Sequence, residues 1–380
     1  MRALNASAPS PRRTRSRYVM WCALLVTCAA AALSVHAQTS GTRASQSATQ
    51  TQNADQLAIQ VNDDRMTLAV AKVPQIYLYG PIDANAPQRV EALIKSHKIP
   101  EGSDIYLNSP GGDIDAGLAL GRLFRSGAMT THLGSPRRTA RSPVVPKASS
   151  CVNACAFAFA GGLYRWAPTG NDRMGVQAID GASPNTGKLA DYLKDMGVNP
   201  LVFSNAPGND VAWLTNDQVL GYNLANNGRI PPTAVNRPMN GVASLSLTQM
   251  ARDGEHRLTL LCRPDGITVT AYYTIGAERS RQIVARATQS YFELNHQPAT
   301  EREHMGIAAV AQSVVFSQPI PLTQLDQLLS ARSMGAWLAD KGGAVRYGFW
   351  MELDPVRDNL RDYRNSCLQI AKAQTPAAKG

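Results

Sequence analysis

The sequence of 380 residues lacks the features that mark several specialised classes of protein. It has no heptad or Gly-X-Y repeat, and only one apolar run, near its start, approaches the length of a membrane span. With 44% hydrophobic and 17% charged residues, its composition is that of an ordinary globular protein. These absences exclude a coiled coil, a collagen and a multi-span membrane protein, and the length is sufficient for two domains.

Acidic residues are in the minority, with 28 Asp and Glu against 38 Lys and Arg and a formal net charge of +10. Five of the arginines and none of the acidic residues lie in residues 1–37, so a chain without that segment carries +5. Such a small excess, spread over about 340 residues, gives no reason to expect a nucleic acid as partner.

Residues 1–37 have the layout of a secretory signal peptide. Four arginines precede an uncharged run of 17 residues at 19–35, and Val35-His36-Ala37 resembles a small-residue cleavage site. The run is slightly short for a spanning helix, so we expect cleavage and a periplasmic or secreted protein. An uncleaved membrane anchor is the alternative, and only then would the protein have the membrane as a partner.

Cysteine is scarce, and its spacing argues against a zinc site, because there is no paired C-x-x-C and no histidine nearby. We therefore expect no metal. Cys22 and Cys28 would leave with the signal peptide, and the other four would meet an oxidising compartment: Cys151, Cys155, Cys262 and Cys367. Four cysteines allow three connectivities. We prefer Cys151–Cys155 with Cys262–Cys367, since each bridge then stays within one expected domain.

Residues 38–56, rich in Gln, Thr, Ser and Ala, are expected to be a flexible linker. Strand and helix patterns then alternate. Strands are predicted at residues 73–79, 105–107 and 129–133, one helix opens at Pro87, and a second runs from Asp113 to Phe124 and stops at Gly127. This alternation indicates an α/β layered fold with parallel pairing, which we assign to residues 57–232.

The rest of this part is less regular. Residues 135–150 contain three prolines and no periodicity, which predicts an exposed loop. Residues 151–162 are apolar on all sides and predict a buried helix. A strand is expected at 173–179, a helix at 188–196, and Leu214-Thr215 begins a pattern typical of a capped helix start.

After Pro231-Pro232 the pattern changes to that of a smaller α+β domain, residues 235–372. Residues 256–263 and 267–273 predict two strands of a hairpin around Pro264-Asp265-Gly266. Further strands are expected at 307–316 and 345–352, with a closing helix at 358–371. We recognise no catalytic motif in this part.

Three segments together resemble the proteolytic subunit of Clp protease and the wider crotonase superfamily. They are residues 76–83 (IYLYGPID), residues 107–113 (LNSPGGD) leading into AGLA, and residues 154–162 (ACAFAFAGG), which are similar to the buried helix behind the nucleophile. Residues 213–224 also look like the segment after the catalytic acid. The resemblance covers about residues 73–230 and implies a spiral of strand-strand-helix units, a peptide-sized cleft and a possible homo-oligomer.

The glycine pair in the second segment has a physical role of its own. Glycines at a strand-to-helix turn let the backbone approach a ligand and point N–H groups into a cleft, although a tight turn alone would also need them. With the resemblance, Gly111 and Gly112 are expected to form an oxyanion hole, together with the amide of Ala154.

The resemblance also implies that the catalytic residues are lost. Asn153 stands where the family has its serine, and an amide is not a useful nucleophile. The family histidine falls at Gln177, and no histidine lies between His132 and His256. The family's acid falls at Val211 or, shifted by one, at Asp210. The expected protein is therefore a pseudoenzyme that binds a peptide or protein ligand.

A working hydrolase remains the alternative. Cys155 lies two positions after Asn153, and Cys151, Ser149 and Ser150 lie just upstream, but none has a visible base. His132 ends a strand and could reach the cleft, although a lone histidine there is more often structural. A structural subunit of an oligomer is a third possibility. No cofactor is expected, because an exported protein would not meet the coenzyme A of crotonase chemistry.

Overall fold

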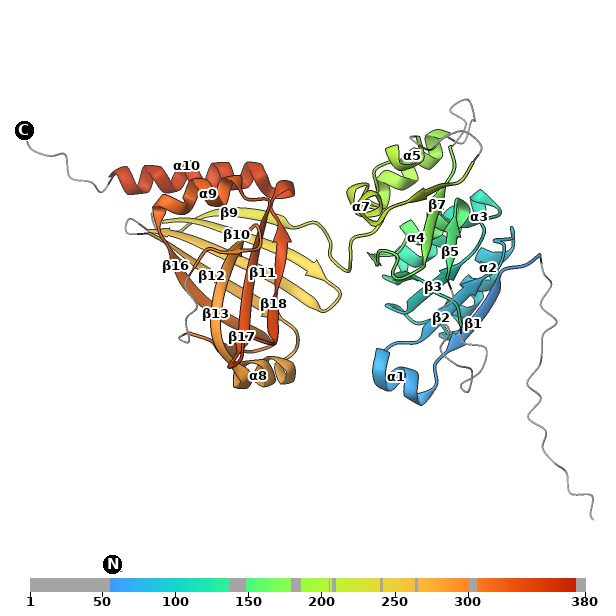
Figure 1. Ribbon diagram of the computed structural model, residues 1–380, viewed down its shortest axis with the longest axis horizontal. Helices are drawn as coiled ribbons and strands as arrows, with labels where there is room; N and C mark the ends of the chain where they lie inside the picture. The colour runs from blue at the N-terminus through green and yellow to red at the C-terminus, as the bar shows by residue number, and fades with distance from the viewer. Residues whose placement is uncertain are drawn as a thin grey trace, which may run out of the picture. The chain divides into compact units, whose positions relative to one another are not determined.

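The computed structural model describes residues 55–136, 148–178, 186–204, 206, 210–239, 242–263, 266–300 and 306–373 (Figure 1). The expected signal peptide and nearly all of the expected linker lie outside these residues. No helix in the described part of the chain is both long and apolar enough to cross a membrane. Two hydrophobic cores organise the fold, one from Leu57 to Ala225 and one from Ala243 to Cys367. The domain limits 57–232 and 235–372 stay predictions.

A five-stranded sheet with the order β1-β2-β3-β4-β6 supports the first core. β1 (Ala58–Asn62) pairs antiparallel with β2 (Gln75–Tyr79), while β3 (Asp104–Asn108), β4 (Thr130–Leu133) and β6 (Tyr164–Arg165) continue the sheet in parallel. Alternate residues of the strands are buried, as the period of two requires: Ile76, Leu78, Ile105 and Leu107. The predicted alternation of parallel strands is therefore present, within a mixed α/β fold.

Two helices of this part lie close to the predicted residues, α2 (Ala86–Lys95) and α3 (Ile114–Ser126), whereas α1 (Arg65–Ala71) was not predicted. The α3 helix starts at Asp113, whose carboxylate accepts a hydrogen bond from the Ala116 amide at 2.8 Å, and it stops at Gly127. Its boundaries were predictable because a cap depends on neighbouring residues alone.

A second, three-stranded sheet corrects one prediction. Its order is β5-β7-β8, with β5 (Ser150–Val152) parallel to β7 (Arg173–Val176) and β8 (Ala212–Leu214) antiparallel to β7. Residues 151–152 were expected to be helical, but the helix α4 spans only Ala154–Ala160. Residues 150–152 form a strand rather than a helix because their backbone is hydrogen-bonded on both sides. One side pairs with β7, and on the other the Val152 amide donates to the Ser109 carbonyl at 3.2 Å.

Three shorter helices complete this part: α5 (Thr186–Asp195), α6 (Leu201–Ser204) and α7 (Asn216–Gly221). The predicted capped start is present in α7, where Thr215 and Gln218 form a reciprocal capping box. The predicted strand 173–179 ends at Val176, and its last residue lies outside the described part. Most of the expected loop 135–150, residues 137–147, also lies outside it.

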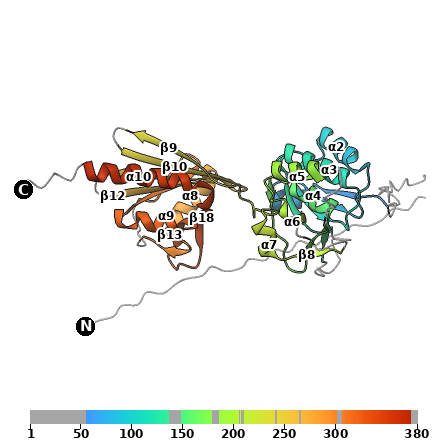
Figure 2. The same ribbon diagram turned by 90° about the horizontal axis from the view of Figure 1, so that it is seen from above.

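Glycines bring α3 and α4 into direct backbone contact (Figure 2). A Cβ atom on Gly117 would lie 2.3 Å from the Ala154 carbonyl oxygen, and one on Gly161 would lie 2.1 Å from the Gly121 carbonyl oxygen. Every residue of α4 is buried. We call Gly117, Gly121 and Gly161 the glycine contact; it fixes the position of the first residue of α4 relative to α3.

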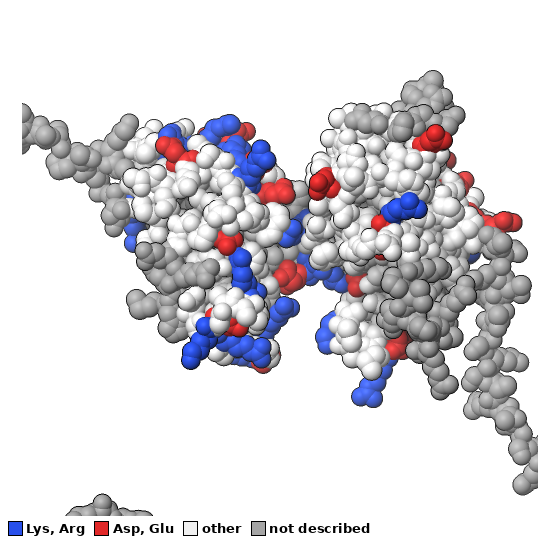
Figure 3. Space-filling view, in the orientation of Figure 1, with Lys and Arg blue, Asp and Glu red and all other residues white. Residues whose placement is uncertain are grey.

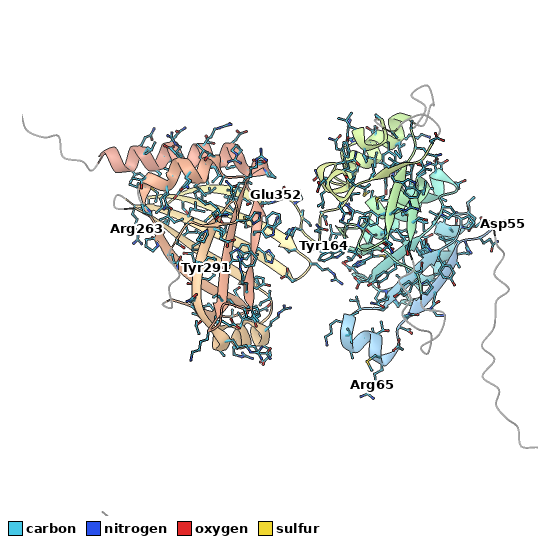
Figure 4. The ribbon with its side chains drawn as sticks, in the orientation of Figure 1. Asp55, Arg65, Tyr164, Arg263, Tyr291 and Glu352 are labelled. Carbon is cyan, nitrogen blue, oxygen red and sulfur yellow. A yellow bond between two sulfur atoms is a disulfide. The ribbon has the colours of Figure 1, made fainter. Side chains whose placement is uncertain are left out.

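The second core lies between two antiparallel sheets, with the orders β15-β16-β12-β11-β10-β9 and β14-β13-β17-β18. Figure 4 shows the side chains of this part, with Tyr291 on β13 and Arg263 at the end of β11. The strands are β9 (Thr233–Met239), β10 (Val242–Ala251), β11 (Gly254–Arg263), β12 (Gly266–Thr274), β13 (Ala287–Leu294), β14 (Gln297–Pro298), β15 (Ala308–Val310), β16 (Ser313–Ile320), β17 (Ser333–Asp340) and β18 (Arg346–Glu352). The helices are α8 (Ala277–Arg286), α9 (Leu325–Ser330) and α10 (Arg357–Ala373).

The sequence predicted part of this arrangement. The hairpin of β11 and β12 and the closing helix α10 are present, although Pro264 and Asp265 of the hairpin turn lie outside the described residues. The single strand expected at 307–316 is wrong. The chain reverses at Ala311, whose φ is +51°, and β15 folds back on β16. On the face seen in Figure 3, basic and acidic side chains are interspersed, so that face carries no continuous basic surface.

Candidate functional site

The centre of the site is the single residue that joins β5 to α4. Asn153 has φ +46° and ψ −104°, which is neither helical nor extended, and such a conformation costs on the order of 1–3 kcal/mol in a residue with a side chain. Asparagine tolerates positive φ better than most residues. A strand, a sharply turned residue and a buried helix form the elbow on which hydrolases present a nucleophile. Here the elbow presents an amide.

The side chains of Asn153 and Gln177 meet. The backbone N–H of Gln177 donates to Oδ1 of Asn153 at 2.8 Å, and Nδ2 of Asn153 donates to Oε1 of Gln177. The structure therefore brings together the two positions that the sequence placed at the family's serine and histidine. Both side chains are half-buried, and neither has a group that takes up a proton near neutral pH.

The Gly111–Gly112 turn lies directly against this elbow. A Cβ atom on Gly111 would be 3.0 Å from the Val152 carbonyl oxygen and 4.0 Å from Cβ of Asn153. The two glycines have φ values of +109° and +137°, and a Cβ atom on Gly112 would be 2.2 Å from the Ile82 carbonyl oxygen. Only glycine fits these positions. The Ile82 amide donates to the Gly111 carbonyl at 2.8 Å and holds the turn in place.

The backbone N–H groups of the turn and of the elbow differ in their partners. The Gly111 amide donates to Oγ of Ser109 at 3.1 Å, so it is not available to a ligand. In the described part of the chain, the amides of Gly112 and Ala154 have no acceptor. Ala154 is completely buried, and a buried N–H group without a partner is rare and costs about 1–3 kcal/mol. These two amides, rather than all three predicted ones, are the candidate donors.

Asn153 does not cap α4, although asparagine is a preferred residue at a helix start. Its side-chain oxygen accepts a hydrogen bond from Gln177 instead of from the first turn of α4. The amide pair therefore leaves the buried Ala154 N–H without an acceptor while it fixes the orientation of the elbow side chain.

Of the two residues predicted for the family's acid, Val211 and not Asp210 lies beside Gln177. The register of β7 and β8 pairs Val176 with Ala212, and its continuation places Val211 beside Gln177. A Cβ atom on Gly175 would lie 2.5 Å from Cγ1 of Val211, so this side chain packs on β7. Asp210 is exposed, and it has no hydrogen bond or ion pair to another described residue.

The cysteines near the elbow form a disulfide. Cys151 at the end of β5 is bonded to Cys155 in the first turn of α4, with a Cα–Cα distance of 5.1 Å, and both residues are completely buried. Cys262 and Cys367 form the second bridge. This is the preferred pairing. It leaves no thiol at the site, so neither Cys151 nor Cys155 is a nucleophile in this state.

The remaining alternative groups do not converge on Asn153. Ser149 is buried and its Oγ lies 3.1 Å from Oγ of Ser135, while Ser150 belongs to β5. The ring of His132 stacks on Tyr106 at 4.7 Å, and its Nε2 is 3.7 Å from Oδ1 of Asp104. Its neighbours Thr131 and Leu133 are buried under the helices, so the imidazole points to the opposite face of the sheet.

Two further residues border the site, and the sequence did not single them out. A Cβ atom on Gly175 would lie 3.1 Å from Cζ3 of Trp213, so the indole covers this glycine of β7, two residues before Gln177. The guanidinium of Arg173 lies 4.3 Å from the centre of that indole. The alternation of positions 173 and 175 along one strand was the available signal, but the opposite strand had to be known as well.

The described residues contain no group of three or more His, Cys, Asp or Glu side chains arranged to hold a metal ion. The described site combines two backbone amides without an acceptor, a pair of neutral side-chain amides, and the Arg173–Trp213 pair.

No protein-family model and no curated protein matches the sequence. Among solved structures, the chain is similar to a serine-to-alanine mutant of the membrane-bound stomatin-specific protease 1510-N, with 19% identity and a TM-score of 0.29 over 39% of this chain and 75% of that one. It is similar to a protein assigned as an enoyl-CoA hydratase from Streptomyces avermitilis, with 14% identity and a TM-score of 0.29 over 44% and 66%. A mutant of ClpP1 from Listeria monocytogenes matches with 14% identity and a TM-score of 0.26 over 42% and 93%. The neighbours thus have Clp-like protease and crotonase folds, and each match covers less than half of this chain.

Proposed function

We propose that this protein is an exported pseudoenzyme of the Clp-like peptidase type, which binds an extended peptide or protein segment without cleaving it. The observation that supports this most strongly is the Asn153–Gln177 pair beside the amides of Gly112 and Ala154, which have no acceptor among the described residues. In this proposal the donors of an acyl-transfer site surround two carboxamides, and a carboxamide is neither a useful nucleophile nor a base near neutral pH.

The proposed binding mode follows from hydrogen bonding. A peptide carbonyl oxygen accepts two hydrogen bonds, and the amides of Gly112 and Ala154 are donors without an acceptor. In a hydrolase, such donors stabilise the oxyanion that forms after attack on the carbonyl. Without attack no oxyanion forms, and the same donors hold the carbonyl in its ground state. The ligand is then bound and released unchanged.

Export rests on two independent features. The N-terminal 37 residues have a signal-peptide layout, and all four cysteines that follow are paired in disulfides. Disulfides persist in oxidising compartments and are rare in the cytosol. A homo-oligomer, which the resemblance implies, is compatible with a role in binding.

The experiment that tests this function is a peptide-array binding measurement with the protein from residue 38 onward, coupled to mass analysis of the bound peptides. We expect binding of a subset of extended peptides with micromolar or weaker affinity and recovery of every peptide intact. Cleavage of the bound peptides would support the alternative, an active hydrolase. Absence of binding to any peptide would refute the proposal.

A matched pair of variants ties binding to the turn. Gly112→Ala places a Cβ atom 2.2 Å from the Ile82 carbonyl oxygen and so displaces the donor turn. Gly102→Ala is the control, because Gly102 also has a positive φ of +74° but has no atom within 4 Å of its Cβ position. We expect Gly112→Ala to lose binding, while Gly102→Ala loses only stability. Equal peptide binding by both variants would show that the Gly111–Gly112 turn does not take part in binding.

A further inference from the structure

We propose that Arg173 and Trp213 select the ligand. The bound segment then carries a carboxylate close to the residue whose carbonyl accepts hydrogen bonds from the amides of Gly112 and Ala154. This inference rests on the proposed function and names the chemical class of its ligand: an extended, acidic peptide segment.

Arg173 and Trp213 lie on one face of the β7–β8 pair. Arg173 and Gly175 are alternate residues of β7, and Trp213 is paired with Gly175 across the ladder. Since side chains alternate across a strand, Arg173 and Trp213 point to the same face, and Gln177 follows directly after the end of β7. The absence of a side chain at Gly175 lets the indole of Trp213 lie flat on the backbone, where 42% of the residue remains exposed.

Among the described residues, the Arg173 cation on this face has no acidic partner. The guanidinium of Arg173 lies 4.3 Å from the centre of the indole, and no described acidic residue forms an ion pair with it. The neighbouring carboxylate of Asp172 is engaged elsewhere, because it accepts a hydrogen bond from the Ser149 amide at 2.7 Å. The indole holds the guanidinium in one orientation, so its N–H groups are arranged for a carboxylate before the ligand arrives.

The spacing sets where the carboxylate must be. An extended chain rises about 3.3 Å per residue, so Gly175 lies roughly 7 Å from Gln177. The guanidinium of Arg173 lies over the indole that contacts Gly175, which puts the cation on the order of 7 Å from the Asn153–Gln177 pair. An extended ligand has the same rise, so its carboxylate lies about two residues from the bound carbonyl.

Two sources can supply such a carboxylate: an Asp or Glu side chain, and the free C-terminus of a peptide. The test therefore starts from peptides that bind and uses them with an acetylated N-terminus. In each peptide a single Glu or Gln is placed at one position, and the position is varied along the sequence. Every peptide is made both with an amidated and with a free C-terminus. We expect about tenfold tighter binding of Glu over Gln at one position of the amidated series, as for a charge-assisted hydrogen bond. A preference that requires the free acid assigns the carboxylate to the C-terminus.

Arg173→Gln should abolish this preference while binding of the Gln peptides is retained, and Arg173→Lys should restore only part of it, because an ammonium lacks the planar stack on Trp213. Arg257→Gln is the matched control. Its guanidinium lies at the same 4.3 Å from the ring of Tyr272 on the second core, and we expect the preference to survive its loss.

The outcomes separate the two proposals. Binding of Glu and Gln peptides with equal affinity at every position, or a preference that survives Arg173→Gln, overturns the selection by Arg173 and leaves the proposed function intact. A failure of all peptides to bind the unmodified protein overturns the proposed function itself.

Discussion

The Gln177 amide donates to Oδ1 of Asn153 at 2.8 Å, across a sequence separation of 24 residues. This contact, made by the backbone N–H of Gln177, places the end of β7 beside the elbow. A second contact joins the two side chains, because Nδ2 of Asn153 donates to Oε1 of Gln177. The elbow residue is thus held to Gln177 by one backbone and one side-chain hydrogen bond, and neither carboxamide exchanges a proton near neutral pH.

The mature protein is expected to be inert towards fluorophosphonate probes and unstructured peptide substrates. Asn153 offers no nucleophile, and His132 points to the other face of the sheet. Labelling is measured by intact mass after long incubation, with an active serine peptidase as the positive control. Stoichiometric labelling of a serine near the elbow would show that a functional base exists.

Restoring chemistry should need two substitutions. Asn153→Ser alone supplies a hydroxyl without a base, so we expect no esterase activity above background. Asn153→Ser with Gln177→His places a base within reach, because these side chains are already in contact. Activity should stay weak, since Val211 provides no carboxylate to orient the histidine. Hydrolysis of an activated ester measures both variants, and a single variant as active as the double one would contradict this account.

Removing the two disulfides should have unequal effects on stability. The bridge between Cys262 and Cys367 spans 105 residues, whereas the bridge between Cys151 and Cys155 spans 4. In the chain-entropy model, a loop of about 100 residues contributes about 4.7 kcal/mol, and a short loop contributes less. We expect the double alanine variant of the long bridge to have the lower Tm in calorimetry. A lower Tm for the variant without the Cys151–Cys155 bridge would mean that this bridge stabilises the folded state of the elbow more than it restricts the unfolded chain.

Several tyrosines should ionise late. Burial, and then the nearby Asp104 carboxylate, raise the pKa of Tyr106 to about 12, and burial raises the pKa of Tyr192 and Tyr363 above the ordinary value of about 10. The unfolded chain therefore loses these protons first, so their contribution to stability is present below pH ~10 and is lost as the pH rises. Tyrosinate absorbance should show a late phase, which Tyr106→Phe reduces. A single phase near pH 10 in the folded protein would contradict these shifts.

The sequence predicted the local features of the fold better than the long-range ones. The start of α3 at Asp113 and its end at Gly127 were predictable, because caps are set within a few residues. β5 was misassigned because an apolar run fits a buried helix and a buried strand equally well. The turn at Ala311 was missed because neither glycine nor proline marks it.

At the site, the type of each residue was predictable and its contacts were not. Asn153 and Gln177 could be assigned to lost catalytic positions, yet their mutual hydrogen bonds depend on the pairing of β5 with β7. The hydrogen bond from the Gly111 amide to Oγ of Ser109 could not be predicted either, because it depends on the conformation of the turn. Trp213 was not predicted to border the site, because its position over Gly175 follows from the register of two strands.

The glycine contact makes the shape of the elbow independent of the side chain that the elbow carries. Gly117, Gly121 and Gly161 leave no space for a side chain between α3 and α4, so the spacing of the two helices does not depend on which residue occupies position 153. The chain can therefore be treated as a scaffold with an exchangeable surface. A saturation library should accept many residues at 173, 177 and 213 and almost none at the three glycines. We expect selection from such a library to yield proteins that keep the α3–α4 packing and carry another charge around position 153.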